Sequence, residues 1–188
     1  MVTSFQTRFT KATTVFPATA FAIKALALSL WIALSAQISL PFWPVPMTLQ
    51  PMSIITIGLV CHPSVSMAAI MAYLLEGALG FPVFHNFHGG LAHMMGTTGG
   101  YLLGFVLMVG LIGRFKSLTT TFVQRFLLVV TAHLSLFIPG VLWLSTFIGW
   151  DQALQWGFYP FIVKIPVEGS FALLTAFFIQ SIRKPTGK

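Results

Sequence analysis

Charged side chains are absent from most of this sequence, and their absence constrains the fold more than any other feature. No Asp, Glu, Lys or Arg occurs between Lys24 and Glu76, or between Glu76 and Arg114. Of the 188 residues, 7% are charged and 56% are apolar, whereas about a quarter of an ordinary soluble domain is charged. Because so few polar side chains cannot cover a water-exposed surface, a soluble enzyme, a disordered chain and a disulfide-rich secreted scaffold are excluded. The sequence predicts an integral membrane protein.

Turns rich in Pro and Gly divide the chain into six apolar stretches. A membrane-spanning helix needs about 20 apolar residues, so the length allows about six spans. We therefore predict an all-α integral membrane protein with six transmembrane helices, forming a single transmembrane domain over residues 1–188. Within the fifth span, Pro139 predicts a kink. The expected spans are 16–38, 47–60, 64–79, 97–112, 126–148 and 158–182.

The first span also has features of a signal peptide. Arg8 and Lys11 precede it, and residues 33–36 resemble a cleavage site. The apolar run over 15–38 is longer than the hydrophobic region of a signal peptide, and the following sequence is also apolar. We therefore expect the first span to be retained.

The positions of the cations predict the orientation in the membrane. Three expected loops, 39–46, 81–96 and 149–157, contain neither Lys nor Arg. The positive-inside rule places these loops outside and both termini in the cytoplasm, with cytoplasmic tails over 1–15 and 183–188. We predict a multi-pass protein of the cytoplasmic (inner) membrane. The cations expected on the cytoplasmic side are Arg8, Lys11, Arg114, Lys116, Arg125, Arg183, Lys184 and Lys188.

Small residues follow one face of the first predicted helix at spacings of three and four. Small residues at such spacing let another helix approach closely in lipid. The stripe has two interpretations, which are packing inside this bundle and docking of a partner membrane protein. The residues are Ala18, Ala22, Ala25, Ser29 and Ala33.

Four ionisable residues lie within the expected spans, where charge is costly and indicates function. Lys24 is close enough to the cytoplasmic edge for its side chain to reach the headgroups. Glu76 lies one turn before the outer end of its span. Lys164 and Glu168 are four residues apart on one helical face and can pair. This pair either holds the helix in register or forms a polar floor for a ligand, with Lys164 as the partner of an anionic group.

The loop around 85–93 combines three histidines with two glycines. His85, His88 and His93 are residue types that bind nickel or cobalt, but no Cys or inward Asp accompanies them, so we predict no metal site. Gly89 and Gly90 allow the backbone to approach a ligand closely. The sequence contains no hydrolase motif and no nucleotide-binding loop, so we expect a protein that is not an enzyme and carries no cofactor.

Four short motifs, in this order, resemble the BioY family. They are PVPMTLQ at 44–50, GALGFPVF at 77–84, GG at 89–90 and TGGYLLGF at 98–105. The likeness covers about residues 18–178 and implies a six-helix, biotin-binding S component of an energy-coupling-factor (ECF) transporter. Its biotin site would face outward under extracellular loops. The resemblance also implies a transmembrane scaffold subunit and cytoplasmic ATPases as partners, and a first helix whose small residues contact the scaffold.

The last helix departs from the family pattern. After a Pro-Phe like that at 160–161, the family carries Gly-Asp and, three residues later, Lys. In this register Ile165 occupies the Asp position and Glu168 the Lys position, and Thr97 stands where Pro is usual. Lys164 lies one turn before the Lys position, so both charge types remain on one helical face with their order exchanged.

We hypothesise that Lys164 neutralises the biotin carboxylate, while Glu168 and Asn86 bond the ureido ring, which has two N–H donors and one carbonyl acceptor. Aromatic side chains would pack on the apolar ring and chain of biotin. The alternatives are transport of another small anionic vitamin or of nickel or cobalt, and a structural membrane subunit without catalysis. The other expected contacts are Phe42, Trp43, Tyr101, Gln50, Gly89 and Gly90.

Overall fold

The protein is almost entirely helical. The computed structural model describes the backbone of residues 3–183 and the side chains of residues 18–182. The all-α class is confirmed, because the strands of this described part form one short hairpin. The elements are α1 (Thr3–Gln37), β1 (Ser39–Leu40), β2 (Met47–Thr48), α2 (Gln50–Val60), α3 (Pro63–Ala78), η1 (His85–Phe87), α4 (Leu91–Met94), α5 (Gly99–Phe115), η2 (Lys116–Leu118), α6 (Phe122–Ser135), α7 (Phe137–Ile148), α8 (Trp150–Gly157), η3 (Tyr159–Phe161) and α9 (Lys164–Arg183).

The first and last elements bear on the expected tails. α1 begins at Thr3, so most of the tail expected over 1–15 belongs to a helix, although its side chains lie outside the described residues. Arg183 is the last residue of α9, and the remainder of the tail expected over 183–188 also lies outside them.

Four helical stretches of the described chain are long and apolar enough to cross a membrane. The expected spans 47–60 and 64–79 correspond to α2, with 11 residues, and α3, with 16. At about 1.5 Å per residue, both are shorter than the roughly 30 Å apolar core of a bilayer. These findings support a multi-pass membrane protein, and the count of six spans stays a prediction. The four stretches are Ala18–Gln37, Gly99–Leu118, Phe122–Ile148 and Trp150–Ile182.

The expected fifth span is interrupted at Leu136, between α6 and α7. Pro139 lies three residues further along and has no N–H, so it cannot bond the carbonyl of Ser135 as a helix requires. α5 packs against this break, where a Cβ at Gly104 would overlap the carbonyl of Leu136. The kink that the sequence predicted at Pro139 therefore creates a close contact between α5 and the α6–α7 junction.

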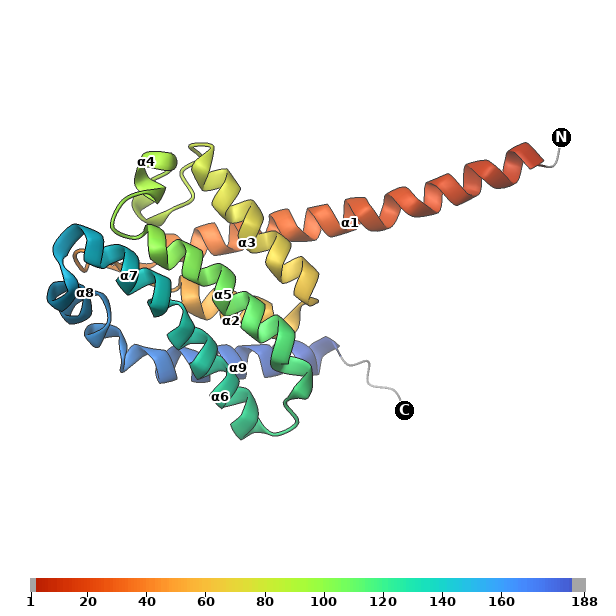
Figure 1. Cartoon of the computed structure of the whole chain (residues 1–188). Helices are drawn as coiled ribbons and strands as arrows, with labels where there is room; N and C mark the ends of the chain where they lie inside the picture. Colours follow the sequence, from red (N-terminus) through yellow and green to blue (C-terminus); the bar gives the residue numbers. More distant parts are fainter. Residues whose placement is uncertain (1–2, 184–188) are drawn as a thin grey trace.

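The three loops without Lys or Arg lie at one end of the helices. Figure 1 shows α4 and α8 at that end, and the start of α1, the end of α9 and η2 at the other. The stretch 149–157 is not the loop that its polar residues indicated, because α8 fills it. Its helical pattern places Ala153 and Gly157 against the bundle and polar side chains outward.

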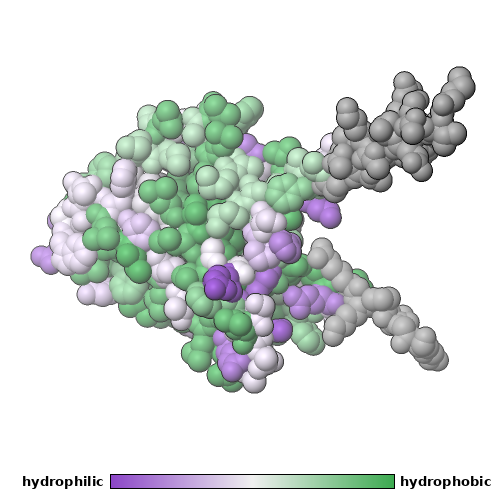
Figure 2. Space-filling view, turned by 45° about the vertical axis from the view of Figure 1, so that its right-hand side comes forward, coloured by the Kyte–Doolittle hydropathy of each residue, from purple (hydrophilic) through white to green (hydrophobic). Residues whose placement is uncertain are grey.

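Apolar side chains cover much of the surface as well as the core. The core packs α1 against α3, α5 against α7 and α2 against α9. In Figure 2, apolar residues spread over most of the visible face, and strongly hydrophilic residues gather mainly toward the end where the grey segments emerge. This distribution is typical of a protein whose sides contact lipid.

The stripe of small residues on α1 divides into two parts. Ala25, Ser29 and Ala33 are buried inside this chain's own bundle, where α1 packs on α3. For these three, burial supports the interpretation of packing inside this bundle, because residues already covered offer little surface to a partner. Ala18 and Ala22 are exposed, and for them docking stays a prediction.

Two of the four ionisable residues expected within spans are Lys24 and Glu76, on α1 and α3. Lys24 is exposed, as its snorkelling interpretation requires. Glu76 accepts a hydrogen bond of 2.8 Å from the hydroxyl of Ser29, which links α3 to α1. Ser29, one of the small residues of α1, thus donates a hydrogen bond to the carboxylate of Glu76.

Candidate ligand-binding site

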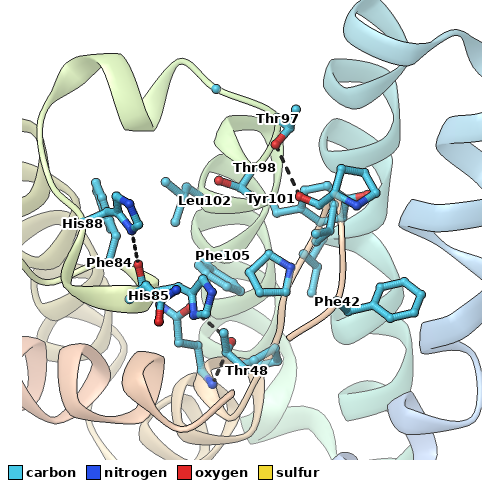
Figure 3. Close-up of a pocket in the computed structure, with 18 of the residues that line it drawn as sticks. Phe42, Thr48, Phe84, His85, His88, Thr97, Thr98, Tyr101, Leu102 and Phe105 are labelled. Atoms are coloured by element: carbon cyan, nitrogen blue, oxygen red, sulfur yellow. Dashed lines mark hydrogen bonds between the residues drawn. The ribbon is translucent and has the colours of Figure 1, made fainter. Parts of the chain in front are cut away.

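A cavity of about 610 Å³ opens at the end of the molecule that carries the loops. Its walls include three segments far apart in sequence, which are the β1–β2 hairpin, the loop before α5 and the start of α9. Figure 3 shows residues of the hairpin and of the loop around this space. Its lining includes the aromatic residues Phe42, Trp43, Tyr73, Phe84, Tyr101, Phe105, Phe137 and Phe161 and the polar residues Thr48, Gln50, His85, Asn86, His88, His93, Thr97, Thr98, His133 and Lys164.

The hairpin forms one wall. Its strands pair Ser39 with Thr48 and Leu40 with Met47, and the proline-rich tip between them cannot become helical. The ring centroid of Phe42 lies 6.3 Å from those of both Trp156 and Phe161, so Phe42 joins the hairpin to α8 and η3. Trp43, 74% exposed, is at the mouth of the cavity.

The opposite wall is the loop that contains η1, and Gln37 holds it against α1. The side chain of Gln37 donates to the carbonyl of Phe84 at 3.0 Å and accepts from the N–H of Phe87 at 3.0 Å. Between these contacts, Asn86 has the left-handed φ of 56°, a conformation that Asn adopts more readily than most residues. Asn86 lines the cavity, and its side chain makes no hydrogen bond to the described part of the chain.

The two glycines expected beside a ligand instead position this loop. Gly89 packs on the turn after α3, where a Cβ would overlap the carbonyl oxygen of Phe81. The N–H of Gly90 donates to the carbonyl of Gly77 at 2.6 Å, and its φ of 92° favours glycine. Neither is among the cavity-lining residues, so the close backbone approach predicted by the sequence occurs between two parts of the chain.

Two of the loop histidines stack on each other. The ring centroids of His88 and His93 are 4.7 Å apart, with an angle of 12° between the ring planes. The ring of Phe84 also stacks on His93, at 5.6 Å between centroids. Burial lowers the pKa of His85 and His93, and the nearby His88 lowers both further. In the part of the chain described here, no three His, Cys, Asp or Glu side chains are grouped to hold a metal ion.

A buried charged cluster lies where α9 meets α6. Lys164 Nζ is 3.3 Å from Glu168 Oε1 and donates to the carbonyl of Thr48 at 2.7 Å, which ties α9 to the hairpin. His133 Nε2 is 3.7 Å from Glu168 Oε2. Glu168 is 4% exposed and does not itself line the cavity; it lies behind Lys164 and His133, which do. Neither carboxylate oxygen accepts a hydrogen bond within the described chain.

The remaining predicted contacts lie around this cluster. Gln50 donates to the hydroxyl of Tyr73 at 2.6 Å and accepts from the hydroxyl of Thr48 at 3.1 Å. Tyr101 donates its hydroxyl to the carbonyl of Gly157 at 2.9 Å, so its ring is what it offers to the cavity. Six of the nine predicted contacts therefore line one space, namely Phe42, Trp43, Gln50, Asn86, Tyr101 and Lys164.

The sequence did not identify His133 or Gln37 as site residues. His133 is 2% exposed and stacks on Phe137 at 6.1 Å. A histidine inside an apolar span is an ionisable group in the membrane, and this signal would have placed it beside Lys164 and Glu168. Gln37 gave no such signal, because its partners lie 47 and 50 residues away.

Comparisons with known proteins agree with one another. The model of the BioY family matches residues 7–185. The "Probable biotin transporter BioY" of Pyrococcus horikoshii is 38% identical over 153 residues, which cover 79% of this chain and 90% of that protein. The "Biotin transporter BioY" of Thermotoga maritima is 34% identical over 156 residues, which cover 80% and 92%.

A solved structure has the same fold. It is a crystal structure of the S-component for biotin from an ECF-type ABC transporter, with a TM-score of 0.72 and 25% identity. The match covers 91% of this chain and 94% of that one. Because the family match extends over nearly all of the sequence and both relatives are aligned over most of their length, this chain belongs to the BioY family.

Proposed function

We propose that this chain binds biotin and takes part in biotin uptake as the S component of an ECF-type transporter. The observation that carries this proposal is the aromatic-walled cavity of about 610 Å³ at the loop end of a BioY-family chain. Its volume is within the range of about 300–1,000 Å³ typical of small-molecule sites. Among the described residues that line it, Lys164 alone carries a full charge.

The finer features of this transporter are part of the proposal. Six spans with both termini in the cytoplasm would open the cavity to the outside of the cytoplasmic membrane, since the loops around it lack Lys and Arg. Because the sequence has no nucleotide-binding loop, ATP hydrolysis would belong to partner subunits. The exposed Ala18 and Ala22 would remain available for a scaffold subunit.

The geometry of the charged pair limits how biotin can bind. The carboxylate and the ureido ring of biotin lie at opposite ends of an apolar chain, whereas Lys164 and Glu168 are 3.3 Å apart. One biotin molecule therefore places only one of its polar ends at this pair. Lys164 and Glu168 therefore bind the same end of biotin, either the carboxylate or the ureido ring, and not one end each.

The chemistry of the pair favours the ureido ring. Lys164 offers N–H donors to the ureido carbonyl, and Glu168 offers acceptors to the ureido N–H groups. Glu168 has two buried oxygens that accept no hydrogen bond from the described chain, and a ureido N–H would reach them where the side chains of Lys164 and His133, which stand in front, move aside. A biotin carboxylate at this place would be repelled by Glu168, whereas at the open mouth of the cavity it keeps its water.

The other lining residues suit the remainder of the ligand. Phe42, Trp43 and Tyr101 offer ring faces to the bicyclic ring and its chain. The unpaired amide of Asn86 can donate and accept, so it bonds a polar end of the ligand. Gln50 is already hydrogen-bonded to Tyr73 and Thr48, so its role is to fix these two residues of the cavity wall in place.

The test is a binding comparison in purified protein. Biotin and its uncharged amide are titrated calorimetrically into the wild type, Lys164→Ala and Lys24→Ala. We expect saturable biotin binding by the wild type and by Lys24→Ala. Lys164→Ala should lower the affinity for biotin and for its amide by a similar factor, because the Lys164 side chain contacts the ureido end, which both ligands share. A loss confined to biotin would return the carboxylate to Lys164. Absence of biotin binding by the wild type, with binding of nickel or cobalt, would overturn the function.

A further inference from the structure

A second cavity, of about 570 Å³, lies at the opposite end of the helices. It is bounded by the end of α2, by η2 and the start of α6, and by the last turns of α9. It shares no lining residue with the cavity at the loop end. The residues that line it are Leu59, Lys116, Ser117, Thr119, Thr120, Phe122, Arg125, Leu173, Leu174, Ala176, Phe177 and Gln180.

One end of this second cavity is positively charged without a counter-charge. None of the three acidic residues of the chain lines it. Lys116 donates to the carbonyl oxygens of Gly58 and Cys61, so its ammonium is fixed at the end of α2. Arg125 is exposed, and its side chain makes no hydrogen bond or ion pair with the described chain. Its guanidinium is therefore free to bind an anion, most favourably a phosphate or carboxylate.

The other wall of the second cavity is apolar and faces outward. Leu173 is buried, but Leu174 and Phe177 on the same helix are 60% and 72% exposed. Large apolar side chains this exposed are stable beside hydrocarbon and not beside water. Ser117 and Thr120 add polar residues to the same lining.

We propose that this second cavity binds an anionic phospholipid. Basic pockets between transmembrane helices bind the headgroups of anionic lipids, and here the phosphate would contact Arg125 and Lys116. An acyl chain would lie along Leu174 and Phe177 on α9. Such a lipid would fill the space between η2, the start of α6 and the last turns of α9. The proposal does not depend on the identity of the ligand at the loop end.

A lipid fits this second cavity better than a partner protein does. The lining changes from charged to apolar within one concave site, as a phospholipid does from headgroup to chain. The uncompensated cations and the exposed apolar wall are complementary to both parts at once. A protein partner would have to bring an acidic group and an apolar side chain into the same enclosed space.

The test uses delipidated full-length protein in detergent and native mass spectrometry. Phosphatidylglycerol and phosphatidylcholine of identical chains are titrated separately. We expect the wild type to retain phosphatidylglycerol in preference. Arg125→Gln should weaken its binding about fivefold, the value of about one basic residue at an anionic membrane surface. The matched control is Arg114→Gln, which removes an exposed cation at the same end that lies over the ring of Phe115 and outside the lining.

A second variant tests the apolar half without changing charge. Phe177→Ser should cause a smaller loss of phosphatidylglycerol binding, and its high exposure means that folding does not depend on it. Equal retention of the two lipids would overturn the proposal, as would equal effects of Arg125→Gln and Arg114→Gln. Displacement of the lipid by inorganic phosphate, with no effect of Phe177→Ser, would also overturn it, because it would indicate an anion site without an acyl-chain contact. Unchanged lipid binding by Arg125→Gln, with loss of a co-purifying subunit, would assign the cavity to a protein.

Discussion

The two cavities border the same helix but balance their charges in opposite ways. At the loop end, the first residue of α9, Lys164, has the carboxylate of Glu168 at 3.3 Å. At the other end, residues 173–180 of α9 face Lys116 and Arg125, and no acidic side chain lines that space. One cavity is therefore nearly neutral before a ligand arrives, and the other is cationic.

This difference indicates different kinds of ligand. A neutral pair of donor and acceptor groups selects a ligand by matching its hydrogen bonds, because an unmatched buried group is costly. Uncompensated cations at a membrane surface attract any suitably placed anion, and this attraction weakens as the salt concentration rises. The two ends of the molecule should therefore respond differently to removal of the pair, to altered packing and to a change of pH.

Removing the cation of the loop-end cavity should have the largest effect. Lys164→Ala leaves the buried carboxylate of Glu168 without its partner. We expect biotin binding to fall at least about 30-fold, as for the loss of one member of a buried charged pair. The free energy of unfolding should fall by about 3–5 kcal/mol. Calorimetry and thermal unfolding in detergent measure the two effects.

A double variant separates binding from folding. Lys164→Met combined with Glu168→Met replaces the pair with apolar side chains of similar size, which restores stability when a buried ion pair is removed whole. Biotin binding should remain lost. If the double variant bound biotin as the wild type does, the pair would serve only to hold α9 in register.

The packing of α5 differs between its two ends and gives the next largest effect. A Cβ at Gly100 would overlap the carbonyl of Pro139 and the side chain of Trp143. A Cβ at Gly110 would be in ordinary contact with Met67, at 3.5 Å. Gly100→Ala should therefore lower the unfolding free energy by about 1–3 kcal/mol, as overpacking does, and Gly110→Ala should have little effect. Equal melting temperatures for the two variants would contradict the close contact of α5 with α7.

Much of the helical architecture could be predicted from local signals. Pro and Gly mark the ends of α2 and α3, and Pro139 marks the break between α6 and α7, because backbone donors and φ values act within a few residues. The helix α8 was missed, since its polar residues resembled a loop. The start of α2 was also misplaced, at 47 and not at Gln50, because an apolar stretch does not reveal where a helix begins or stops.

The site could be predicted only in part. Lys164 was predicted to meet a ligand because it is an ionisable residue within an expected span, and the structure places it on the cavity wall, as it does Asn86. The partners that position them could not be predicted, since Lys164 bonds the carbonyl of Thr48 across 116 residues of sequence. The small face of α1 showed the same limit. Its spacing left packing and docking as alternatives, and only the fold shows that Ser29 meets Glu76 of α3.

His133 gives a smaller test of the loop-end cluster. His133→Leu removes the second polar neighbour of Glu168 and keeps the side chain apolar and of similar size. We expect biotin binding to weaken about tenfold, because a buried acceptor loses a potential donor. The matched control is Leu134→Ala, one residue further along α6 but 40% exposed, which should bind biotin normally. Equal affinities in the two variants would limit His133 to packing on Phe137.

The smallest expected effect is a pH dependence that is confined to the loop end. Burial and the neighbouring His88 lower the pKa of His85 and His93, so the folded state favours their neutral forms. This stabilisation is present above the ordinary histidine pKa of about 6.5 and is lost as the pH falls through the lowered values, because the unfolded chain then binds protons more readily. Thermal unfolding measured from neutral to acidic pH should show this loss, and His93→Gln should reduce it. Arg125 keeps its charge throughout this range, so retention of phosphatidylglycerol should not change with it. A parallel decline of both properties would mean that acid acts on the whole fold and not on the histidine loop.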